Sequence, residues 1–571
     1  MDSAEPTSNA GSSRTKRLTP DLVLVNARVR TMDPAQPLAE GVAVTEGRVV
    51  ALGDTRELLS LVAPHTEVLD LGGHPVTPGL VDSHCHFSAV HEIVTIDAAY
   101  PSVGSIKEIA AKVRERTATV PPGTWIVGTG WNEGTLAERR YIVAADLDTV
   151  SPDHPVWLSH ASECYGAGNS LALRLAGVQS STTDPPHGRI ERDEEGRPTG
   201  VLIDAAQLAV TRLIPPPSQE DRIRGVARAC ELFHAEGVTS VKDGGGDAQR
   251  WEDYLLALER GLLGIRTFFM WEAPRELAPC NALLGHIAGA KASSAARTEH
   301  QLMCGGVKIY LDGTTGARTA WVYDDWYEGP GILDGGNKGY PVVDADVFRD
   351  QVKLFHSNGI HMSVHCIGDR AIDFCLDCYE EALAENPVAG LRHGLIHCHI
   401  PTHEALDRIV ELQRRFDVAV PETQPTFLWF LGDYYAANFG PARNSRLFPL
   451  RSYRMRGINW TAGSDYPVTP AGPRYGIATA MCRRTLLNRY GPHPFGVQEA
   501  IGPLEALAAY SSQAARQLFL ENWVGSLTPG KYADLAVWEH DFGTVTPEEA
   551  RENRCLLTMV GGREVYRRHG F

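Results

Sequence analysis

Long hydrophobic runs are absent from this sequence of 571 residues. No apolar stretch approaches the roughly 20 residues that a helix needs to cross a bilayer, so we expect no membrane segment. The first 20 residues are rich in Ser, Thr and Ala and carry Arg14, Lys16 and Arg17, but they lack the apolar core of a secretory signal. We therefore predict a disordered tail over residues 1–20 and a soluble, cytoplasmic protein.

Positive charge is scarce as well. Lys and Arg number 54 against 70 Asp and Glu, which gives a formal net charge of -16. No cluster of Lys and Arg interleaved with aromatic residues occurs. Because binding to a phosphate backbone depends on a positively charged surface, nucleic acid is excluded as an expected partner.

Cysteine is sparse and odd in number, with 11 residues scattered along the chain. Such a distribution does not form a small disulfide framework and fits reduced thiols in a cytoplasm. Cys375 and Cys378 make a single Cys-x-x-Cys within a helical pattern, and no second pair lies nearby to complete a zinc site. We expect these two thiols to pack on one helix face.

The chain is long enough for one large barrel with additions, or for two or three domains. Short β-rich runs separated by turn signals occupy residues 21–75, and two more such runs lie in residues 523–571. We expect the two ends of the chain to share one sheet in a composite β domain.

Between these ends, short β-branched runs alternate with helical stretches, the order that produces parallel strands with crossover helices. The eight runs begin at Val76, Gly237, Arg266, Gly306, His361, Gly394, Val418 and Ile458. This count predicts an α/β fold with a (β/α)8 TIM barrel over residues 76–522. The gap after the first run is too long for one helix, so we predict an inserted subdomain at about residues 100–220, roofing the carboxyl ends of the strands.

A pair of histidines, His84 and His86, ends the first run. Side chains two apart on a strand project to the same face, so both imidazoles could bind one metal ion. The ends of later runs carry Lys308, His365, His397 and Asp465. Each of these has an ordinary structural explanation by itself, but strand ends converge on one rim of a barrel, and the combination favours a shared metal site.

Motifs between residues 21 and 571 resemble those of the amidohydrolase superfamily and, within it, amidohydrolase family 3, which includes N-substituted formamide deformylases. They are Pro-Gly-Leu-Val-Asp-Ser-His-Cys-His ending at His86, Gly-Trp-Asn-Glu ending at Glu133, Asn-Ser-Leu-Ala-Leu from Asn169, Lys-Ile-Tyr-Leu-Asp-Gly from Lys308, Gly-Asp-Arg-Ala from Gly368, Gly-Ser-Asp-Tyr-Pro-Val from Gly463, and Gly-Ser-Leu-Thr-Pro-Gly-Lys-Tyr-Ala-Asp-Leu from Gly525. Such a combination identifies the family more sharply than the substrate.

The resemblance implies a β-sandwich, built from both chain ends, beside the barrel. It also implies that His84 and His86 hold one ion, that His365 and His397 hold a second, and that Asp465 is both a ligand and the proton shuttle. The expected metal is Zn²⁺, with Mn²⁺ or Co²⁺ as alternatives, in one or two copies. With two ions, Lys308 would be N-carboxylated and bridge them, because a free ammonium has no lone pair for a metal. With a single ion, Lys308 would remain an unmodified hydrogen-bond donor.

The favoured reaction is hydrolysis of a linear C–N bond in a small-molecule N-substituted amide or formamide, by hydroxide that the metal generates and with Asp465 passing the proton to the departing nitrogen. The same centre could instead cleave an ester, lactone, carbamate or cyclic amide. A non-catalytic scaffold that retains the fold is a third reading, which the complete ligand set opposes. A homodimer is an oligomeric state that the resemblance leaves open.

Aromatic residues dominate the candidates for the wall of the substrate pocket and suggest an aryl or bulky apolar substrate. The substrate-binding candidates are Trp131, Arg318, Phe427 and Tyr466. Two stretches depart from the family pattern: Ser162-Glu163-Cys164 in the subdomain and Glu422 in the seventh run. His399 repeats the His-x-His spacing after His397. We expect His399 to lie beside the metal ligands without binding the metal, or to be an ordinary loop residue. We expect the triple glycine Gly244–Gly246 to form a turn after a barrel strand.

Overall fold

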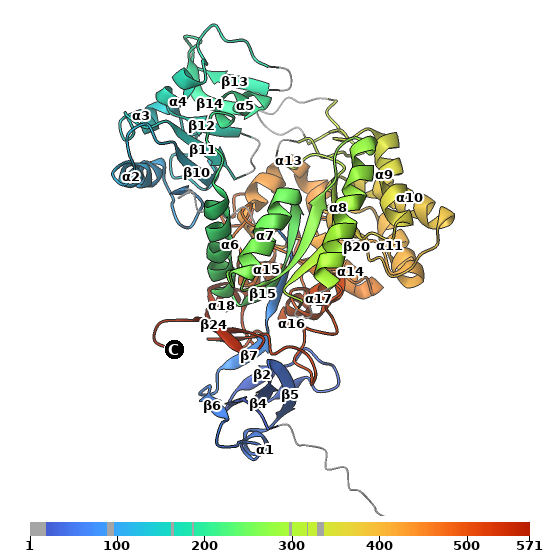
Figure 1. Cartoon of the computed structure of the whole chain (residues 1–571). Helices are drawn as coiled ribbons and strands as arrows, with labels where there is room; N and C mark the ends of the chain where they lie inside the picture. Colours follow the sequence, from blue (N-terminus) through green and yellow to red (C-terminus); the bar gives the residue numbers. More distant parts are fainter. Residues whose placement is uncertain are drawn as a thin grey trace, which may run out of the picture.

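The computed structural model of the chain describes residues 19–87, 96–161, 165–185, 188–295, 300–316, 318–327 and 336–571. Most of the tail predicted to be disordered therefore lies outside the described residues. Three layers follow one another from bottom to top in Figure 1: a pair of β-sheets, a central barrel, and a smaller sheet with its helices. In the described part of the chain, no helix combines the length and apolar character that crossing a membrane requires.

The central layer is an eight-stranded sheet in which all neighbouring strands run parallel. Its strands are β8 (Leu80–Cys85), β15 (Val238–Gly246), β16 (Arg266–Glu272), β17 (Leu302–Tyr310), β18 (Met362–Cys366), β19 (Gly394–His397), β20 (Val420–Thr423) and β21 (Thr461–Ala462). The ring closes between its last and first strands, because the Asp465 N–H donates to the His84 carbonyl at 2.8 Å and the His86 N–H donates to the Tyr466 carbonyl at 2.7 Å. The predicted TIM barrel is confirmed, and each of its eight strands overlaps one of the eight predicted runs.

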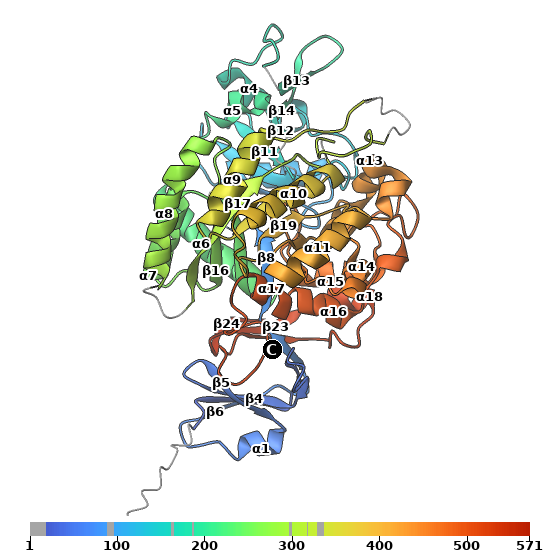
Figure 2. The same ribbon diagram turned by 90° about the vertical axis from the view of Figure 1, so that its right-hand side faces the viewer.

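Helices surround the barrel, as the two views in Figures 1 and 2 show. They include α6 (Gln219–His234), α7 (Ala248–Glu259), α8 (Leu277–Ala295), α9 (Ala345–Ser357), α10 (Asp369–Glu385), α11 (His403–Phe416), α14 (Leu450–Arg456), α15 (Pro473–Cys482), α16 (Pro503–Ala509) and α17 (Ser512–Gln517). Side-chain caps begin several of them: Asp247, Asp344 and Thr402 each accept a hydrogen bond from a backbone N–H of the first turn. Cys375 and Cys378 are buried on α10 with free thiols.

Two sheets pack face to face below the barrel. The first contains β5 (Arg48–Gly53), β4 (Gly41–Thr45), β1 (Leu22–Val25) and β6 (Glu67–Asp70). The second contains β24 (Arg563–Arg567), β23 (Cys555–Val560), β22 (Leu535–Trp538), β7 (Pro75–Pro78), β2 (Arg28–Arg30) and β3 (Leu38–Ala39). Leu24 and Val42 of the first sheet share a buried core with Val76, Leu535 and Leu557 of the second, so the two form a sandwich. Strands from both chain ends pair in the second sheet, and Arg48 of the first sheet forms an isolated β-bridge with Tyr532.

The first predicted strand is divided in the structure. Pro75–Pro78 pairs with β22 in the sandwich, whereas Leu80–Cys85 pairs with β15 in the barrel. The chain changes sheet at Gly79, where a Cβ atom would lie 2.2 Å from the Thr239 hydroxyl oxygen. Periodicity cannot locate this break, because every residue in both halves of the run is buried and neither half alternates between buried and exposed positions.

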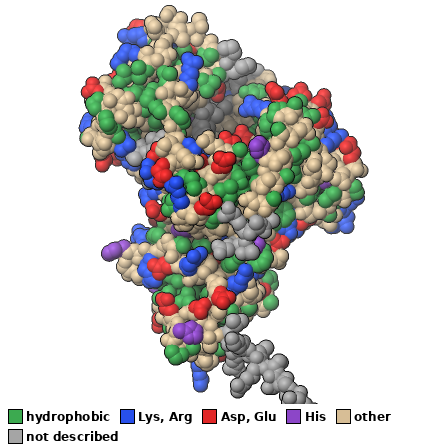
Figure 3. Space-filling view, viewed as in Figure 1, with side chains coloured by type: hydrophobic (Ala, Val, Ile, Leu, Met, Phe, Trp, Pro, Cys, Tyr) green, Lys and Arg blue, Asp and Glu red, His purple; other side chains and the backbone are tan. Residues whose placement is uncertain are grey.

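The upper layer is inserted between β8 and α6, where the sequence predicted a subdomain. Its six strands are β13 (Gly188–Arg192), β14 (Pro198–Asp204), β12 (Tyr165–Gly168), β11 (Val156–His160), β10 (Ile126–Trp131) and β9 (Ile96–Asp97). Its helices include α2 (Ile106–Thr117), α3 (Ala144–Asp148) and α4 (Ser170–Leu175). It lies at the end of the barrel opposite the sandwich (Figure 1), above the carboxyl ends of the barrel strands. On the face shown in Figure 3, Lys and Arg side chains are scattered among acidic ones.

Candidate active site

The residues predicted to bind metal lie at the carboxyl ends of the barrel strands. His84 is in β8, Lys308 in β17, His365 in β18 and His397 in β19. His86 directly follows β8, and Asp465 lies in the segment just after β21. All are buried except His86, whose side chain is 30% exposed. Barrel closure explains this convergence, because the backbone hydrogen bonds that join β8 to the segment after β21 place Asp465 beside His84.

His84, His86 and Asp465 form one group. Oδ1 of Asp465 lies 3.2 Å from Nε2 of His84 and 3.3 Å from Nε2 of His86, and one ligand atom from each residue falls within 4.8 Å of the others. Within the described residues, both ring nitrogens of His84 and Oδ1 of Asp465 are buried without a hydrogen-bond partner. Leaving such an atom unpaired costs about 1–3 kcal/mol, and a cation at this point would satisfy these atoms.

His365 and His397 form a second group, with Nδ1 of His365 only 3.1 Å from Nε2 of His397. Their other nitrogens lie 3.0 Å from the Gly313 carbonyl and 2.8 Å from Oε1 of Gln424. The Gln424 amide is oriented by its own donation to the Glu422 carbonyl at 3.0 Å. Since both outer partners are acceptors, we assign the ring hydrogens to the outer nitrogens, which turns two lone pairs toward one point. This arrangement also fits a cation.

The electrostatics of the site keep His84 and His365 neutral and the carboxylate of Asp465 charged. Burial by itself would lower the pKa of His86, but the neighbouring carboxylate of Asp465 outweighs it and raises that pKa. Burial lowers the pKa of His365 to about 4, and burial together with the charge of Lys308 lowers the pKa of His84 to about 3. Burial by itself would raise the pKa of Asp465, but the neighbouring imidazoles of His84 and His86 outweigh it and hold the pKa well below its usual range. Neutral imidazoles and an ionised carboxylate are the forms that ligate metals.

Lys308 is fully buried near both groups. Burial lowers the pKa of its amine to about 8, and its charge in turn lowers the pKa of His84 and of His365. The ammonium lies 4.5 Å from the centre of the Tyr310 ring. Glu272 stands opposite Lys308 in the pairing of β16 with β17.

Two glycines make room for His84. A Cβ on Gly244 would lie 2.6 Å from Cε1 of the His84 ring, and a Cβ on Gly463 would lie 2.6 Å from the His84 backbone nitrogen. Gly244 and its two neighbours end β15 rather than forming a separate turn, which corrects the sequence prediction for this triple glycine. The space that Gly244 and Gly463 leave for His84 depends on how closely neighbouring strands approach, and the sequence pattern does not contain that distance.

A cavity of about 100 Å³ opens onto these groups. Its walls include His365, His397, Asp465, Ile367, Thr314, Gly316, Phe427, Leu431, Tyr434, Tyr435 and Val468 from the barrel, and Asn132, His160 and Ala161 from the inserted subdomain. The subdomain therefore contributes to the roof of this pocket. Of the four predicted substrate-binding residues, Phe427 lies in the wall, with its ring stacked 5.9 Å from that of His397.

The other three predicted substrate residues lie behind the wall in the described structure. The Trp131 indole is fully buried in the subdomain core and donates to the Leu158 carbonyl at 2.9 Å. Arg318 is 7% exposed and donates to the Tyr327 carbonyl at 2.6 Å. The ring of Tyr466 packs edge-on against Phe233. Aromatic and charged side chains serve packing as readily as binding, so a substrate contact of these three residues stays a prediction.

His160 is a pocket residue that the sequence reasoning missed. It ends β11, its ring stacks on Tyr165 at 4.0 Å, and its Nε2 lies 3.2 Å from Oε2 of Glu133. The Tyr165 hydroxyl donates to both oxygens of Glu133, at 3.0 and 3.1 Å. The strand-end rule used for the barrel could have found His160 if it had been applied to the subdomain. Glu163 and Cys164 lie outside the described residues.

Glu422 and His399, whose roles the sequence left open, lie next to the candidate metal ligands. Glu422 is fully buried inside the barrel, where Oε1 accepts from Lys242 at 2.7 Å and from Ser363 at 2.7 Å. His399 is also buried; its Nδ1 lies 3.3 Å from the Thr315 hydroxyl and its ring packs edge-on against Phe448. In the described structure Glu422 is thus part of a buried ion pair beneath the site, and His399 supports the His397 side of the pocket.

Known proteins resemble this chain in sequence and in fold. The model of the amidohydrolase family matches residues 67–566. The chain is 30% identical to Protein LONG AFTER FAR-RED 3 of Arabidopsis thaliana over 97% of its length and 94% of the relative's, and 29% identical to the N-substituted formamide deformylase of Arthrobacter pascens over 96% and 99%. An uncharacterised metal-dependent hydrolase from Pyrococcus horikoshii shares its fold with a TM-score of 0.70 at 21% identity, over 92% of this chain and 99% of that one. The chain therefore belongs to the amidohydrolase family, as its motifs predicted.

Proposed function

We propose that the protein is a metal-dependent hydrolase that cleaves the linear C–N bond of an N-substituted amide or formamide. The observation that carries this proposal is the convergence of imidazole nitrogens and the Asp465 carboxylate at the carboxyl end of the barrel, where Asp465, His365 and His397 line one pocket. The bond type is supported by the similarity to an N-substituted formamide deformylase along almost the whole chain.

The residues present fit a metal centre. His84, His86 and Asp465 would hold one ion and His365 and His397 a second, since nitrogen and carboxylate donors suit Zn²⁺ and also accept Mn²⁺ or Co²⁺. When bound, the metal makes hydroxide available near pH 7 and polarises a carbonyl oxygen. The position of Lys308 near both groups supports its carboxylation as a bridge between them. Carbon-13 NMR of protein equilibrated with labelled bicarbonate should show a carbamate signal that is lost in Lys308→Met.

Asp465 is the proton carrier in this proposal. Its carboxylate is kept ionised beside His84 and His86, so it can accept a proton as the nucleophile attacks the carbonyl carbon. It then gives that proton to the departing nitrogen, because an amine anion is a very poor leaving group. An ester does not need this second transfer to the same degree.

Asp465→Asn tests the shuttle. The variant should lose about 10²–10⁴-fold in kcat on an amide, because general acid–base catalysis contributes that much. The matched control is Asp407→Asn, which changes an exposed carboxylate of α11 that pairs with Arg456 of α14. Metal content and thermal unfolding of both variants should be measured alongside turnover. An Asp465→Asn protein that keeps most of its activity would remove Asp465 from this role.

A substrate panel tests the reaction itself. N-substituted formamides and amides should be hydrolysed faster than matched esters, lactones, carbamates and cyclic amides. Chelation should abolish the activity, and Zn²⁺, Mn²⁺ or Co²⁺ should restore it. Faster cleavage of the esters would favour the alternative reaction at the same centre. Protein that binds no metal and hydrolyses no compound would instead be a scaffold that retains only the fold.

A further inference from the structure

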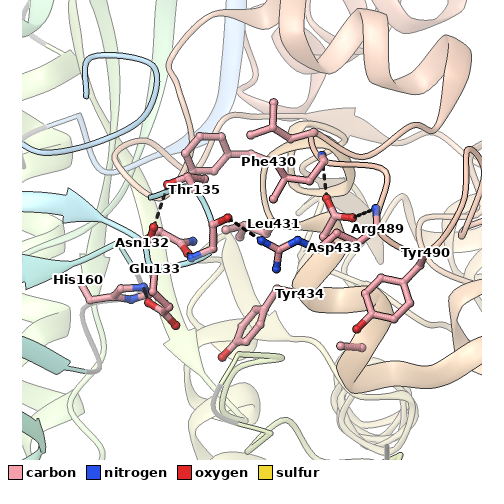
Figure 4. A pocket seen from close by; sticks show the side chains of 14 residues that line it. Asn132, Glu133, Thr135, His160, Phe430, Leu431, Asp433, Tyr434, Arg489 and Tyr490 are labelled. Atoms are coloured by element: carbon pink, nitrogen blue, oxygen red, sulfur yellow. Dashed lines mark hydrogen bonds and ion pairs between the residues drawn. The ribbon is translucent and has the colours of Figure 1, made fainter. Parts of the chain in front are cut away.

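A second chamber opens beside the metal pocket, with a volume of about 240 Å³. It is lined by Asn132, Glu133, Gly134, Thr135 and His160 from the subdomain and by Phe430, Leu431, Asp433, Tyr434, Ala437, Leu486, Leu487, Arg489 and Tyr490 from the barrel (Figure 4). Asn132, His160, Leu431 and Tyr434 also line the pocket at the metal ligands, so the two spaces share a wall. The outer chamber is the larger one, which suits the part of a substrate that does not react.

The barrel side of this chamber is mostly apolar. Phe430, Leu431 and Ala437 lie beside the rings of Tyr434 and Tyr490, which are 42% and 53% exposed. Tyrosine rings at such a surface offer a flat apolar face at a low cost in side-chain entropy. A planar or aromatic group fits this wall.

The two acidic residues of the chamber are already occupied. The carboxylate of Asp433 accepts from the backbone N–H groups of Leu487 at 2.9 Å and Arg489 at 2.7 Å. The carboxylate of Glu133 accepts from the Tyr165 hydroxyl and lies 3.2 Å from His160. Their negative charge is therefore directed at protein groups.

The guanidinium of Arg489 is placed differently. Figure 4 shows it reaching across the chamber toward the loop of Glu133 and Gly134, where it donates to the Gly134 carbonyl at 3.3 Å. This hydrogen bond is long, and no carboxylate of the described residues forms an ion pair with Arg489. Most of its N–H donors thus remain available, and their planar fork matches a carboxylate in bidentate geometry.

We propose that this chamber is a subsite for the far end of the substrate, and that it selects a planar apolar group ending in a carboxylate bound by Arg489. This subsite adds a substrate class to the proposed function. The reaction in the inner pocket rests on the proposed function, whereas carboxylate binding by Arg489 does not. A carboxylate would replace the weak contact with Gly134 by charge-assisted hydrogen bonds. Arg489 is therefore a specificity-determining residue.

Calorimetric titration tests the subsite without any turnover. The full-length wild-type protein should bind 4-methylbenzoate at least about ten-fold more tightly than 4-methylbenzamide, a difference of about 1.4 kcal/mol, which one hydrogen bond to a charged group can supply. Arg489→Gln should abolish this difference, whereas Arg484→Gln should retain it. Arg484 is a matched control because it lies on the same segment but pairs with Glu548 and is not in the wall of the chamber.

Kinetics on the metal-loaded enzyme give a second readout. 4-(Formamidomethyl)benzoate should have a lower KM than N-benzylformamide, and Arg489→Gln should raise only the KM of the carboxylate. Equal affinity of the wild type for the two titrated ligands, no binding of either, or an unchanged preference in Arg489→Gln would overturn the proposal. Hydrolysis of both formamides with equal KM would overturn the carboxylate subsite but leave the proposed function intact. Binding of the benzoate without hydrolysis of any amide would instead count against the proposed function alone.

Discussion

Gly244 decides how much room the His84 imidazole has at the metal site. A methyl group there would lie 2.6 Å from Cε1 of the ring, so the imidazole or strand β15 must move. We expect Gly244→Ala to weaken metal binding by about 10–100-fold, the usual effect of disturbing a residue that supports a ligand. Metal affinity can be measured by competition with a chelator. Gly285→Ala on α8, where a Cβ meets no atom within 4 Å, is the control and should bind metal like the wild type.

At the scale of the elements, two hydrogen-bonded histidines, His356 and His393, join α9 to β18 and to the segments around it. The Met362 N–H donates to Nδ1 of His393 at 3.2 Å, so Nε2 of His393 donates to His356 at 3.0 Å, and His356 donates to the Asn386 carbonyl at 2.6 Å. A proton added to Nδ1 of His393 would face the Met362 N–H, and the hydrogen bond between them would be lost. Burial accordingly lowers the pKa of His393 to about 3.

The buried, hydrogen-bonded His393 predicts a loss of folding stability in acid. The pKa of His393 is lower in the folded than in the unfolded state, so its contribution is complete above pH 6.5 and is lost as pH falls toward 3. The slope is about 1.4 kcal/mol per pH unit for one group. Between pH 7 and pH 5.5 the urea midpoint should fall more in the wild type than in His393→Gln, which can keep both hydrogen bonds without titrating. Equal falls in the two proteins would show that His393 does not contribute.

At the scale of the whole molecule, a buried ion pair couples the barrel to the sandwich. Arg266 of β16 donates to both oxygens of Asp534, at 2.7 and 3.0 Å, and the two side chains are only 3% and 1% exposed. Asp534 also accepts from the Gly561 N–H at 2.7 Å. This accounts for the aspartate in the family motif near the carboxyl end of the chain.

Asp534→Asn would remove the carboxylate charge from this buried pair with Arg266. We expect the variant to lose about 3–5 kcal/mol of unfolding free energy, the usual cost of breaking a buried pair. Thermal and urea denaturation should both report the loss. Glu385→Gln breaks an exposed pair with Lys353 and should change stability by no more than about 1 kcal/mol. Similar midpoints for the two variants would show that the sandwich is not held by this contact.

The sequence by itself determined the barrel and the meeting of the predicted metal ligands at one end of it. The alternation of strands and helices dictates a parallel closed sheet, and such a sheet brings His84, His365, His397 and Asp465 to one rim wherever they lie in the chain. Each of these inferences depends on the order and period of residue types, which a sequence contains. The family resemblance rests on the same local motifs.

Only the tertiary structure decided what depends on close approach between distant segments. The change of sheet at Gly79, the room that Gly244 leaves for His84, and the position of His160 in the pocket all depend on atoms from other strands. The same holds for the chamber in which Arg489 crosses from the barrel to the subdomain. Periodicity records which residues are apolar or polar, but packing in three dimensions determines which of them meet.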